Sequence, residues 1–578
     1  YYLNVTAVSE SGFSSPVLSG TQSTLSCSPI SGIKTVGAGG DYPNLTIAFS
    51  EINSCTLSGN TELQLIAGYP AAAETYPITG PTTTPVGAFT LKVYPTVSGL
   101  SITSANATGT LNLNNSFNVT IDGRVNQTGV KDLVISNTGA GYAVQFVNDA
   151  KSNTLQHLTM HSANNSTTSG TVVFGGSTGT TGNDNNLIDN CDIRDGASTP
   201  LNAIYSAGTS TTVDNSGNTV SNSNIYNYYG AASASNGILL ASNSSAWTIN
   251  ANKFYQTATR TSTSGSTHRA INVITSSGNG YVITNNVIGY ASSTATGVTT
   301  YAGAFANRFV AIELTAATTG TASSIQGNTV TGVSLSTTSG ATTAPGIFTG
   351  ISVLGGTVSV GNTTPNIIGG STGTGAISLN TTTSANAFGI HASSTGTLIV
   401  SNNVVGSINA TGATAAVSCG IVGINTAGAS TATTVTGNTI GSTTANSIAS
   451  GTTGVTTAAA TVSGIATAGA STALTVSGNT INNLTNYSSS TTAVLNGIVS
   501  SGSPVTATIS NNTVSNTSLV SGTLNAISTA SPTTLTVSGN TLFNAAASGA
   551  SGTINGISNG GGTTSSIFKN KIYNLNAA

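Results

Sequence analysis

The octapeptide Leu474-Thr475-Val476-Ser477-Gly478-Asn479-Thr480-Ile481 carries the pattern that decides the fold of this chain. In it, an apolar residue is followed by two small or polar residues, an asparagine, any residue and a second apolar residue. The pattern returns from about residue 155 to the C-terminus, for example as ITNNVI at 283–288, VTGNTI at 435–440 and ISNNTV at 509–514. Such recurrence indicates a repeat protein.

A second signature, a small residue followed by Ile, lies roughly 14 to 18 residues ahead of each copy. Two phased signals with a period of roughly 28 to 42 residues indicate a stack of similar coils. The second signature stands at 237–238, 270–271, 311–312, 350–351, 389–390, 423–424, 464–465, 497–498, 526–527 and 556–557.

Each motif is too short for a helix and is rich in Val, Ile, Thr, Asn and Gly, which favour strands and turns. Alternation places Val and Ile on one face of the strand and Ser or Thr on the other. A parallel β-helix buries one face of short strands in every coil, with neighbouring coils about 4.8 Å apart. The sequence therefore predicts an all-β solenoid with protruding loops. The main rival, an array of β-sandwiches, would not repeat a fixed asparagine.

The repeated asparagine is predicted to turn the corner between strands, because Asn tolerates left-handed backbone angles. If coils stack, these side chains form a hydrogen-bonded amide ladder. Cys191 occupies the equivalent position in an earlier coil, as a small buried residue. The predicted ladder comprises Asn218, Asn252, Asn286, Asn328, Asn403, Asn438, Asn479, Asn512, Asn540 and Asn570.

Charged residues make up only 4% of the chain, with 12 basic and 14 acidic side chains. This balance argues against nucleic acid as a partner, because that binding needs clustered Lys and Arg. No apolar run approaches the roughly 20 residues that span a bilayer, so no membrane insertion is expected. Low charge with abundant Ser and Thr is also typical of disorder, but the recurring Val and Ile supply a core.

The chain has four cysteines. Cys27 and Cys55 bracket one segment and could pair, which would fit an oxidising, extracellular setting. Cys191 and Cys419 fall in different coils and are expected to be buried thiols. Asn-x-Ser/Thr sequons occur at the frequency expected from composition, so they are weak evidence for glycosylation.

Residues 1–25 alternate as two strands around a Gly turn, and resemble the last two strands of a fibronectin type III domain. The resemblance implies a modular extracellular protein that begins here in mid-domain. The Gly-rich lead, the segment DYPNLTIAF and the strand at 63–66 resemble the opening of pectin-lyase-like right-handed β-helix proteins. The turn at 121–124 also resembles that superfamily.

Residues 26–90 are therefore expected to form an N-terminal cap and the first coil. Leu45, Ala48, Phe49 and Ile52 fall at helical spacing, and an amphipathic helix here would shield the open end of the solenoid. Residues 91–578 are expected to form the parallel β-helix. Its last copy stops without a cap, so we expect the native protein to continue past Ala578.

Together, asparagine corners, a helical cap, a fibronectin-like remnant and an excess of Thr, Ser and Gly resemble large secreted surface proteins of Bacteroidota. That resemblance implies export by the type IX secretion pathway, with contacts to the secretion machinery or to further copies.

Pectin-lyase-like folds host polysaccharide lyases and glycoside hydrolases, which need paired or calcium-binding carboxylates. After Asp214 the only carboxylate is Glu313, so the C-terminal half is expected to lack such chemistry. His268 and Arg269 are interpreted as loop and strand-edge residues. One charged constellation remains, made of Asp184, Asp189, Asp192, Arg194 and Asp195.

Alternation places Asp192 and Arg194 outside, with His161 beside Arg194 one coil earlier. A catalytic interpretation makes Asp189 and Asp192 metal or acid groups, Arg194 the base and His161 an assistant. The preferred interpretation is an exposed ladder of ion pairs, each of small stabilising effect. In the same columns two coils later stand Lys253 and Tyr255.

Aromatic residues crowd the middle of the chain, and exposed rings in a row could stack on sugar faces. The alternative is that they fill gaps under long loops. The candidates for glycan contact are Tyr226, Tyr228, Tyr229 and Tyr255.

The preferred function is a non-catalytic, stiff extracellular β-solenoid at a cell surface, acting as an adhesin stalk or filament component. No cofactor is expected, and glycans or other surface proteins are the expected partners. The first alternative is a polysaccharide lyase or glycoside hydrolase that uses the charged coil around Asp192. A second is an ice- or surface-binding Thr face, but the outward residues are too mixed in sequence for a regular Thr array.

Overall fold

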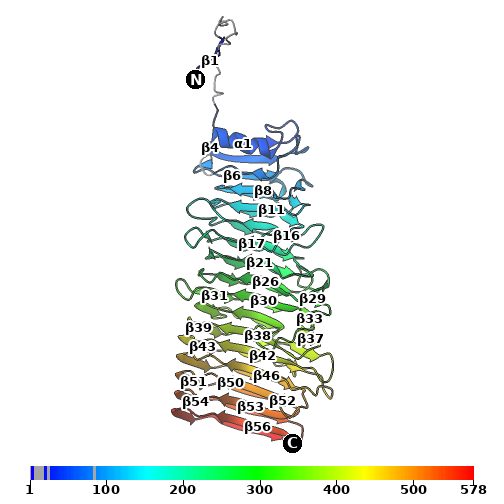
Figure 1. Ribbon diagram of the computed structural model, residues 1–578, viewed down its shortest axis with the longest axis vertical. Coiled ribbons are helices and arrows are strands. Elements are labelled where there is room, and N and C mark those ends of the chain that lie inside the picture. The colour runs from blue at the N-terminus through cyan, green and yellow to red at the C-terminus, as the bar shows by residue number, and fades with distance from the viewer. Residues whose placement is uncertain (1, 6–17, 22–26, 83–85) are drawn as a thin grey trace, which may run out of the picture.

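The computed structural model describes residues 2–5, 18–21, 27–82 and 86–578. Residues 27–82 and 86–578 form a right-handed parallel β-helix whose coils stack along the long axis of the molecule (Figure 1). The predicted all-β solenoid is confirmed. Among the described residues, no helix is long and apolar enough to cross a membrane.

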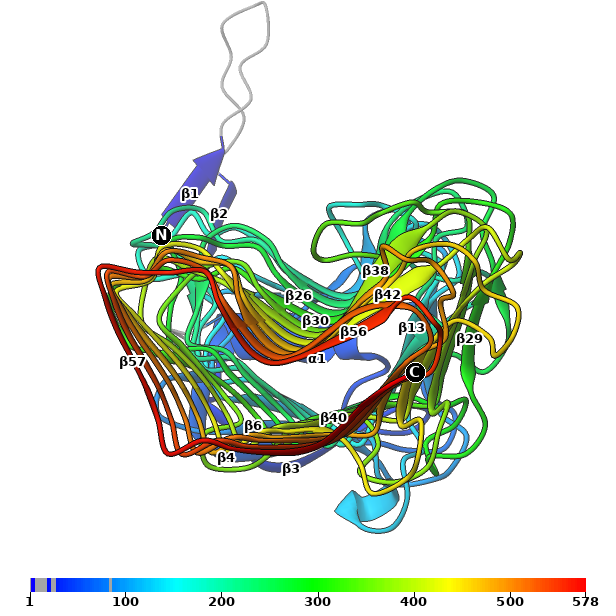
Figure 2. The same cartoon turned by 90° about the horizontal axis from the view of Figure 1, so that it is seen from below.

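Most coils contribute one strand to the first of three parallel sheets, one or two to the second and one to the third. In the coil that holds the defining octapeptide, β47 (Ala473–Ser477) lies in the first sheet, β48 (Thr480–Asn482) in the second and β50 (Val494–Ser500) in the third. The next first-sheet strand, β51 (Thr506–Ser510), pairs with β47 in parallel. The third sheet has 15 strands, and Figure 2 shows the sheets enclosing a common interior.

The core is a continuous column of aliphatic side chains, one layer per coil. Val476 pairs with Ile509 in the first sheet, Ile481 with Val514 in the second and Ile498 with Ile527 in the third. These side chains are all buried. Removing such apolar surface from water is the main favourable term in folding, and each coil supplies it for its neighbours.

The corner between the first and second sheets carries the amide ladder. Nδ2 of Asn479 donates to Oδ1 of Asn512 at 2.9 Å and to the backbone oxygen of Val435 at 2.9 Å. The separations along the chain range from 28 to 42 residues. Side chains linked in this way are those of Asn252, Asn286, Asn328, Asn366, Asn403, Asn438, Asn479, Asn512, Asn540 and Asn570.

The structure corrects two details of the predicted corner. The left-handed residue is not the ladder asparagine but the residue before it, such as Gly478 at φ 64° and Asn511 at φ 56°. Gly and Asn meet that need at little steric cost. The ladder asparagine is selected instead for its amide, which satisfies buried backbone groups.

Asn218, predicted as a ladder member, lies at the opposite end of the first sheet. It precedes β19 (Thr219–Ser221), and its Oδ1 accepts from the side chain of Asn186 at 3.0 Å. The ladder position in that coil is held by Ser223, whose hydroxyl oxygen accepts a hydrogen bond from the backbone N–H of Cys191. The prediction failed because Gly217-Asn218 imitates the Gly-Asn of the corner.

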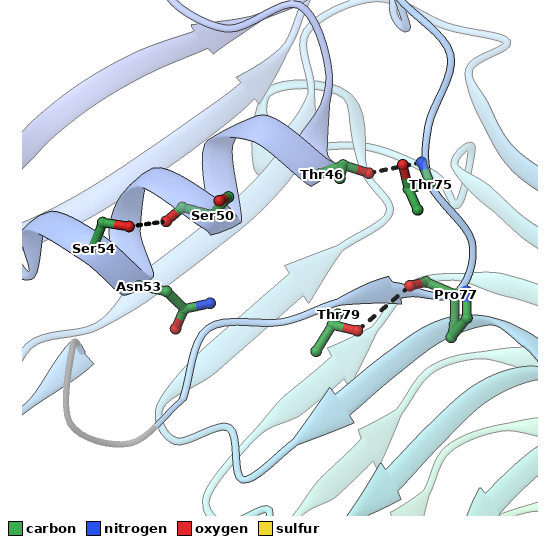
Figure 3. A pocket seen from close by; sticks show the side chains of 7 residues that line it. All are labelled: Thr46, Ser50, Asn53, Ser54, Thr75, Pro77 and Thr79. Atoms are coloured by element: carbon green, nitrogen blue, oxygen red, sulfur yellow. Dashed lines mark hydrogen bonds between the residues drawn. The ribbon is translucent and has the colours of Figure 1, made fainter. Parts of the chain in front are cut away.

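Helix α1 (Leu45–Cys55) covers the N-terminal end of the solenoid (Figure 1), as predicted. Leu45, Ala48, Phe49 and Ile52 are buried on its inner side. The helix begins at Asn44, whose side chain accepts from the backbone N–H of Ile47. A hydroxyl-lined pocket separates its outer side from β5 (Ile78–Thr79), as Figure 3 shows.

Glu74 also holds the start of α1. Its carboxylate accepts from the backbone N–H groups of Leu45 and Thr46, both at 2.8 Å, where the helix dipole favours negative charge. At the other end of α1, Cys55 forms a disulfide with Cys27. Cys191 and Cys419 are buried free thiols.

The expected fibronectin-like segment is described only in part. Strands β1 (Tyr2–Val5) and β2 (Leu18–Thr21) pair antiparallel, whereas residues 1, 6–17 and 22–26 lie outside the described residues.

Candidate functional site

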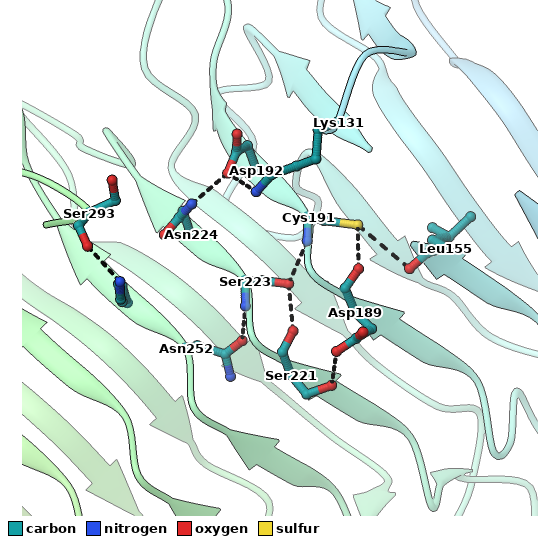
Figure 4. Close-up of polar contacts among 11 residues, drawn as sticks. Lys131, Leu155, Asp189, Cys191, Asp192, Ser221, Ser223, Asn224, Asn252 and Ser293 are labelled. Atoms are coloured by element: carbon teal, nitrogen blue, oxygen red, sulfur yellow. Dashed lines mark hydrogen bonds and ion pairs between the residues drawn. The ribbon is translucent and has the colours of Figure 1, made fainter. Parts of the chain in front are cut away.

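The charged constellation predicted near Asp192 sits on a convex corner. Asp189 ends β15 (Leu187–Asp189) of the first sheet, and Asp192 begins β16 (Asp192–Asp195) of the second. Buried Cys191 lies between them, so the two carboxylates point outward from different sheets (Figure 4). They do not face each other across a cleft.

Each of these carboxylates is occupied by neighbouring side chains. Lys131 Nζ and Asn224 Nδ2 both reach Asp192 Oδ1 at 2.7 Å. The hydroxyl of Ser221 donates to Asp189 at 2.7 Å. Partly exposed ion pairs of this kind contribute little stability, and neighbouring groups already hydrogen-bond to both carboxylates.

The remaining members of the constellation follow the predicted columns. His161 pairs in register with Arg194, and Arg194 donates to the backbone oxygen of Asp195. Asp184 accepts from the backbone and hydroxyl of Ser216, both at 2.9 Å, and burial raises its pKa. Among the described residues, no group of three or more His, Cys, Asp or Glu side chains could hold a metal ion.

The predicted aromatic strip is broken. Tyr226 and Tyr255 stack on adjacent coils with ring centroids 4.7 Å apart. Tyr228 and Tyr229 are buried in the core, so neither can present its face to a glycan. Of the four candidates, Tyr226 alone is not buried. The burial of three of these four rings is what the alternative interpretation, rings that fill gaps, expects.

The third sheet has a different shape, because its strands bend at the small-Ile signature. In β30 (Arg308–Leu314), Ala311 and Ile312 both belong to the core, so two successive residues face inward. The outward residues on either side of them, Val310 and Glu313, therefore tilt toward each other. Figure 2 shows this sheet curving into the cross-section, which makes its outer face concave.

The bend explains why the signature needs a small residue. A Cβ placed on Gly350 would lie 2.6 Å from Cγ2 of Ile368 in the second sheet. The rings of Phe388 and His391, which flank Gly389-Ile390, approach to 5.9 Å across the same bend. We call the outer side of the third sheet the concave face. One of its columns contains Asn236, Arg269, Val310, Thr349 and Phe388, and the other Leu239, Asn272, Glu313, Ser352 and His391.

An ion pair lies on this concave face. Arg269 Nε donates to Glu313 Oε1 at 2.8 Å, and their side chains are 19% and 6% exposed. Arg308 lies nearby and donates from Nε to the backbone oxygen of Gly346. Burial lowers the pKa of Arg308, and the charge of Arg269 lowers it further. The pair thus neutralises the single carboxylate of this face.

Beside the ion pair, the concave face holds buried polar atoms that form no hydrogen bond with any of the described residues. Asn272 Nδ2 donates to Asn236 Oδ1 at 3.0 Å, but Oδ1 of Asn272 has no partner among the described residues. The hydroxyl of Ser352 is buried and also lacks a partner there. These two groups flank Glu313 in the same column. Unpaired buried polar atoms are costly, which favours a site completed by a hydrogen-bonding ligand.

This site was not among the sequence-based predictions, although the sequence carries a signal for it. Arg269 directly precedes Ala270-Ile271, and Glu313 directly follows Ala311-Ile312. Aligning the copies on that signature places both side chains on one face, in adjacent coils and facing columns. The interpretation of Arg269 as a strand-edge residue was wrong, because it lies within β26 (Thr267–Val273).

No family model and no curated protein matches this sequence. Solved structures that are similar to it include the following two. PfbA, a surface adhesin of Streptococcus pneumoniae, has 13% identity and a TM-score of 0.33, covering 68% of this chain and 81% of its own. The A-module of the Azotobacter vinelandii mannuronan C-5 epimerase AlgE6 has 12% identity and a TM-score of 0.29, covering 91% and 94%. Neither likeness assigns a function.

Proposed function

We propose that this chain is a non-catalytic stalk of an extracellular adhesin, and that it holds glycans along the concave face. The observation that carries the proposal is the neutralised ion pair of Arg269 and Glu313, flanked by unpartnered Asn272 Oδ1 and Ser352 Oγ. Amides and hydroxyls bind sugar hydroxyls, and the long stack of coils gives the face the length of an extended polymer.

The chemistry of the concave face favours binding over turnover. A hydrolase needs two carboxyl groups about 5 to 9.5 Å apart. Glu313 is the one carboxylate in the two columns, and Arg269 is already paired with it. On the convex corner, the carboxylates of Asp189 and Asp192 are engaged and point apart.

Finer features belong to the same proposal. The disulfide between Cys27 and Cys55 supports an oxidising, extracellular location. A fibronectin type III remnant in residues 1–25 and export by a type IX route from a bacterium of the Bacteroidota would fit a surface protein. Reading the parent gene on both sides of this segment tests both features.

The decisive experiment measures binding and product formation with the same polymers. We would titrate the chain with pectin, alginate and a neutral β-glucan by calorimetry, and analyse each mixture for shortened or unsaturated products. We expect binding of at least one polymer without product. Asn272→Leu should weaken that binding at least tenfold, because the amide is lost from the column of Glu313.

Asp192→Asn, on the convex corner, is the matched control and should leave binding unchanged. Product that disappears in Glu313→Gln would contradict the proposal and make the concave face an active site. Product that disappears in Asp192→Asn would support the lyase or hydrolase alternative instead.

A further inference from the structure

The outer side of the first sheet changes character in the last coils. Five strands of five residues stack there, namely β43 (Ala432–Thr436), β47 (Ala473–Ser477), β51 (Thr506–Ser510), β54 (Thr534–Ser538) and β57 (Thr564–Phe568). Each strand pairs with the next without a register shift, so the first, third and fifth residues form three outward columns. We call this surface the hydroxyl face.

The central column of the hydroxyl face reads Thr434, Thr475, Thr508, Thr536 and Ser566. The column beside the amide ladder reads Thr, Ser, Ser, Ser and Phe, and the third reads Ala, Ala, Thr, Thr and Thr. The sequence suggested outward residues too mixed for a regular array. The two flanking columns are indeed mixed, but the central column holds Thr in four coils and Ser in the fifth.

The hydroxyl groups of this face are held in a rigid lattice. Neighbouring strands repeat about every 4.8 Å along the axis, and alternate residues about every 6.6 Å along a strand. Threonine is stiff at χ1, so its hydroxyl and methyl positions follow the backbone. The amide ladder, through Asn438, Asn479, Asn512 and Asn540, fixes the spacing of the coils at the end of each strand.

The same hydroxyls are free to bind outside the chain. Among the described residues, none hydrogen-bonds to Oγ1 of Thr475, Thr508 or Thr536, which are all partly exposed. Residues 314–568 contain no Asp, Glu, Lys or Arg, so the strands of this face carry no charge, and Lys569 follows the last of them. Figure 2 shows the strands around β57 as nearly straight segments along one side of the cross-section.

We propose that the hydroxyl face binds ice. The partner is an ordered lattice of water, and both repeats of the face are close to oxygen repeats of hexagonal ice. A rigid, uncharged array of hydroxyl and methyl groups can order water at these spacings, whereas a charged or mobile surface cannot. This activity is separate from glycan binding on the concave face and does not depend on it.

The test measures ice recrystallisation and thermal hysteresis with the full chain. The unmodified chain, called the parent, should slow the growth of ice crystals and change the shape of single ice crystals. Thr508→Tyr, in the centre of the face, should reduce the recrystallisation effect at least fivefold, because the bulky ring lifts the lattice from the ice. Thr453→Tyr, on an exposed turn away from the face, is the matched control and should retain the parental effect.

Two further measurements keep the outcome decisive. Thermal melting of both variants at the parental temperature shows that a lost effect is not misfolding, and if Thr508→Tyr melts early, Thr508→Val replaces it and should also lose the effect. A parent without any effect on ice, or an equal effect in Thr508→Tyr, would overturn the proposal.

Binding of the chain to crystalline cellulose above freezing, without an effect on ice, would also overturn it and would indicate a solid glycan as the ligand of this face. Asn272→Leu should leave the ice effect intact, so failure here is distinguishable from failure of glycan binding.

Discussion

Asn479 donates twice to a single atom of the next coil. Its backbone N–H lies 3.0 Å and its side-chain Nδ2 2.9 Å from Oδ1 of Asn512. One oxygen thus satisfies two donors that would otherwise be buried without partners.

Adjacent asparagines at one corner allow a matched test of the ladder. Asn512→Gly should lower the free energy of unfolding by about 1–3 kcal/mol, because buried donors and acceptors lose their partners. Asn511→Gly should change it by less than about 0.5 kcal/mol, because Asn511 has φ 56° and glycine accepts that angle. Urea denaturation measures both, and equal losses would contradict the assigned roles.

The cap can be tested by hydrogen exchange. Phe49 is 1% exposed beneath α1, and Phe49→Ala should cost about 3–5 kcal/mol locally. We expect faster exchange in β3 (Ile30–Val36) and β4 (Leu57–Leu65), with little change in the distant coils, because solenoid repeats contact only their neighbours. Ile47→Ala is the control, since Ile47 is 46% exposed on the same helix. Hydrogen exchange that changes equally in all coils of both variants would contradict the capping role of α1.

The disulfide predicts a thiol count. Denatured but unreduced protein should show only the thiols of Cys191 and Cys419, and reduction should add those of Cys27 and Cys55. Reduction should destabilise the N-terminal coils by about 2–4 kcal/mol, because the bridge closes a loop of 28 residues. All four thiols reacting before reduction would exclude the bridge.

Two buried histidines predict sensitivity to acid. Burial, together with the charge of Arg269, lowers the pKa of His268 to about 4, and burial lowers that of His391 to about 4. Below about pH 6.5 these histidines bind protons in the unfolded chain but not in the folded chain. Stability should therefore be full above pH 6.5 and fall toward pH 4, by up to about 3 kcal/mol for each histidine.

His268→Phe is the matched variant for the acid effect. His268 pairs in register with Phe309, which itself pairs with Phe348, so a Phe ring fits the column. Its ring also stacks on Tyr301, with centroids 5.3 Å apart. We expect the variant to lose part of the acid sensitivity in denaturation midpoints between pH 7 and 4. An unchanged profile would show that His268 does not titrate with unfolding.

The sequence predicted those features that a short local pattern encodes. Strands, coil period and most ladder positions follow from the spacing of Val, Ile and Asn around residues such as Asn479. Asn366 was not predicted as a ladder member, because four residues separate it from the left-handed Gly361. In the other coils the left-handed residue directly precedes the ladder asparagine. The site on the concave face was not predicted, because it depends on the register between coils. That register brings Arg269 into contact with Glu313, which lies 44 positions further along the chain.

The extra residues before Asn366 carry a wider consequence for how such a chain can change. Asn366 still receives the backbone N–H of Asn328 and still donates to Asn403, both at 2.9 Å, although its corner is longer than its neighbours. The pitch of the helix is therefore set by the amides and is independent of the circumference of any one coil. New loops can be grafted at these corners without disturbing the axis, so decoration and length can evolve separately on one rod.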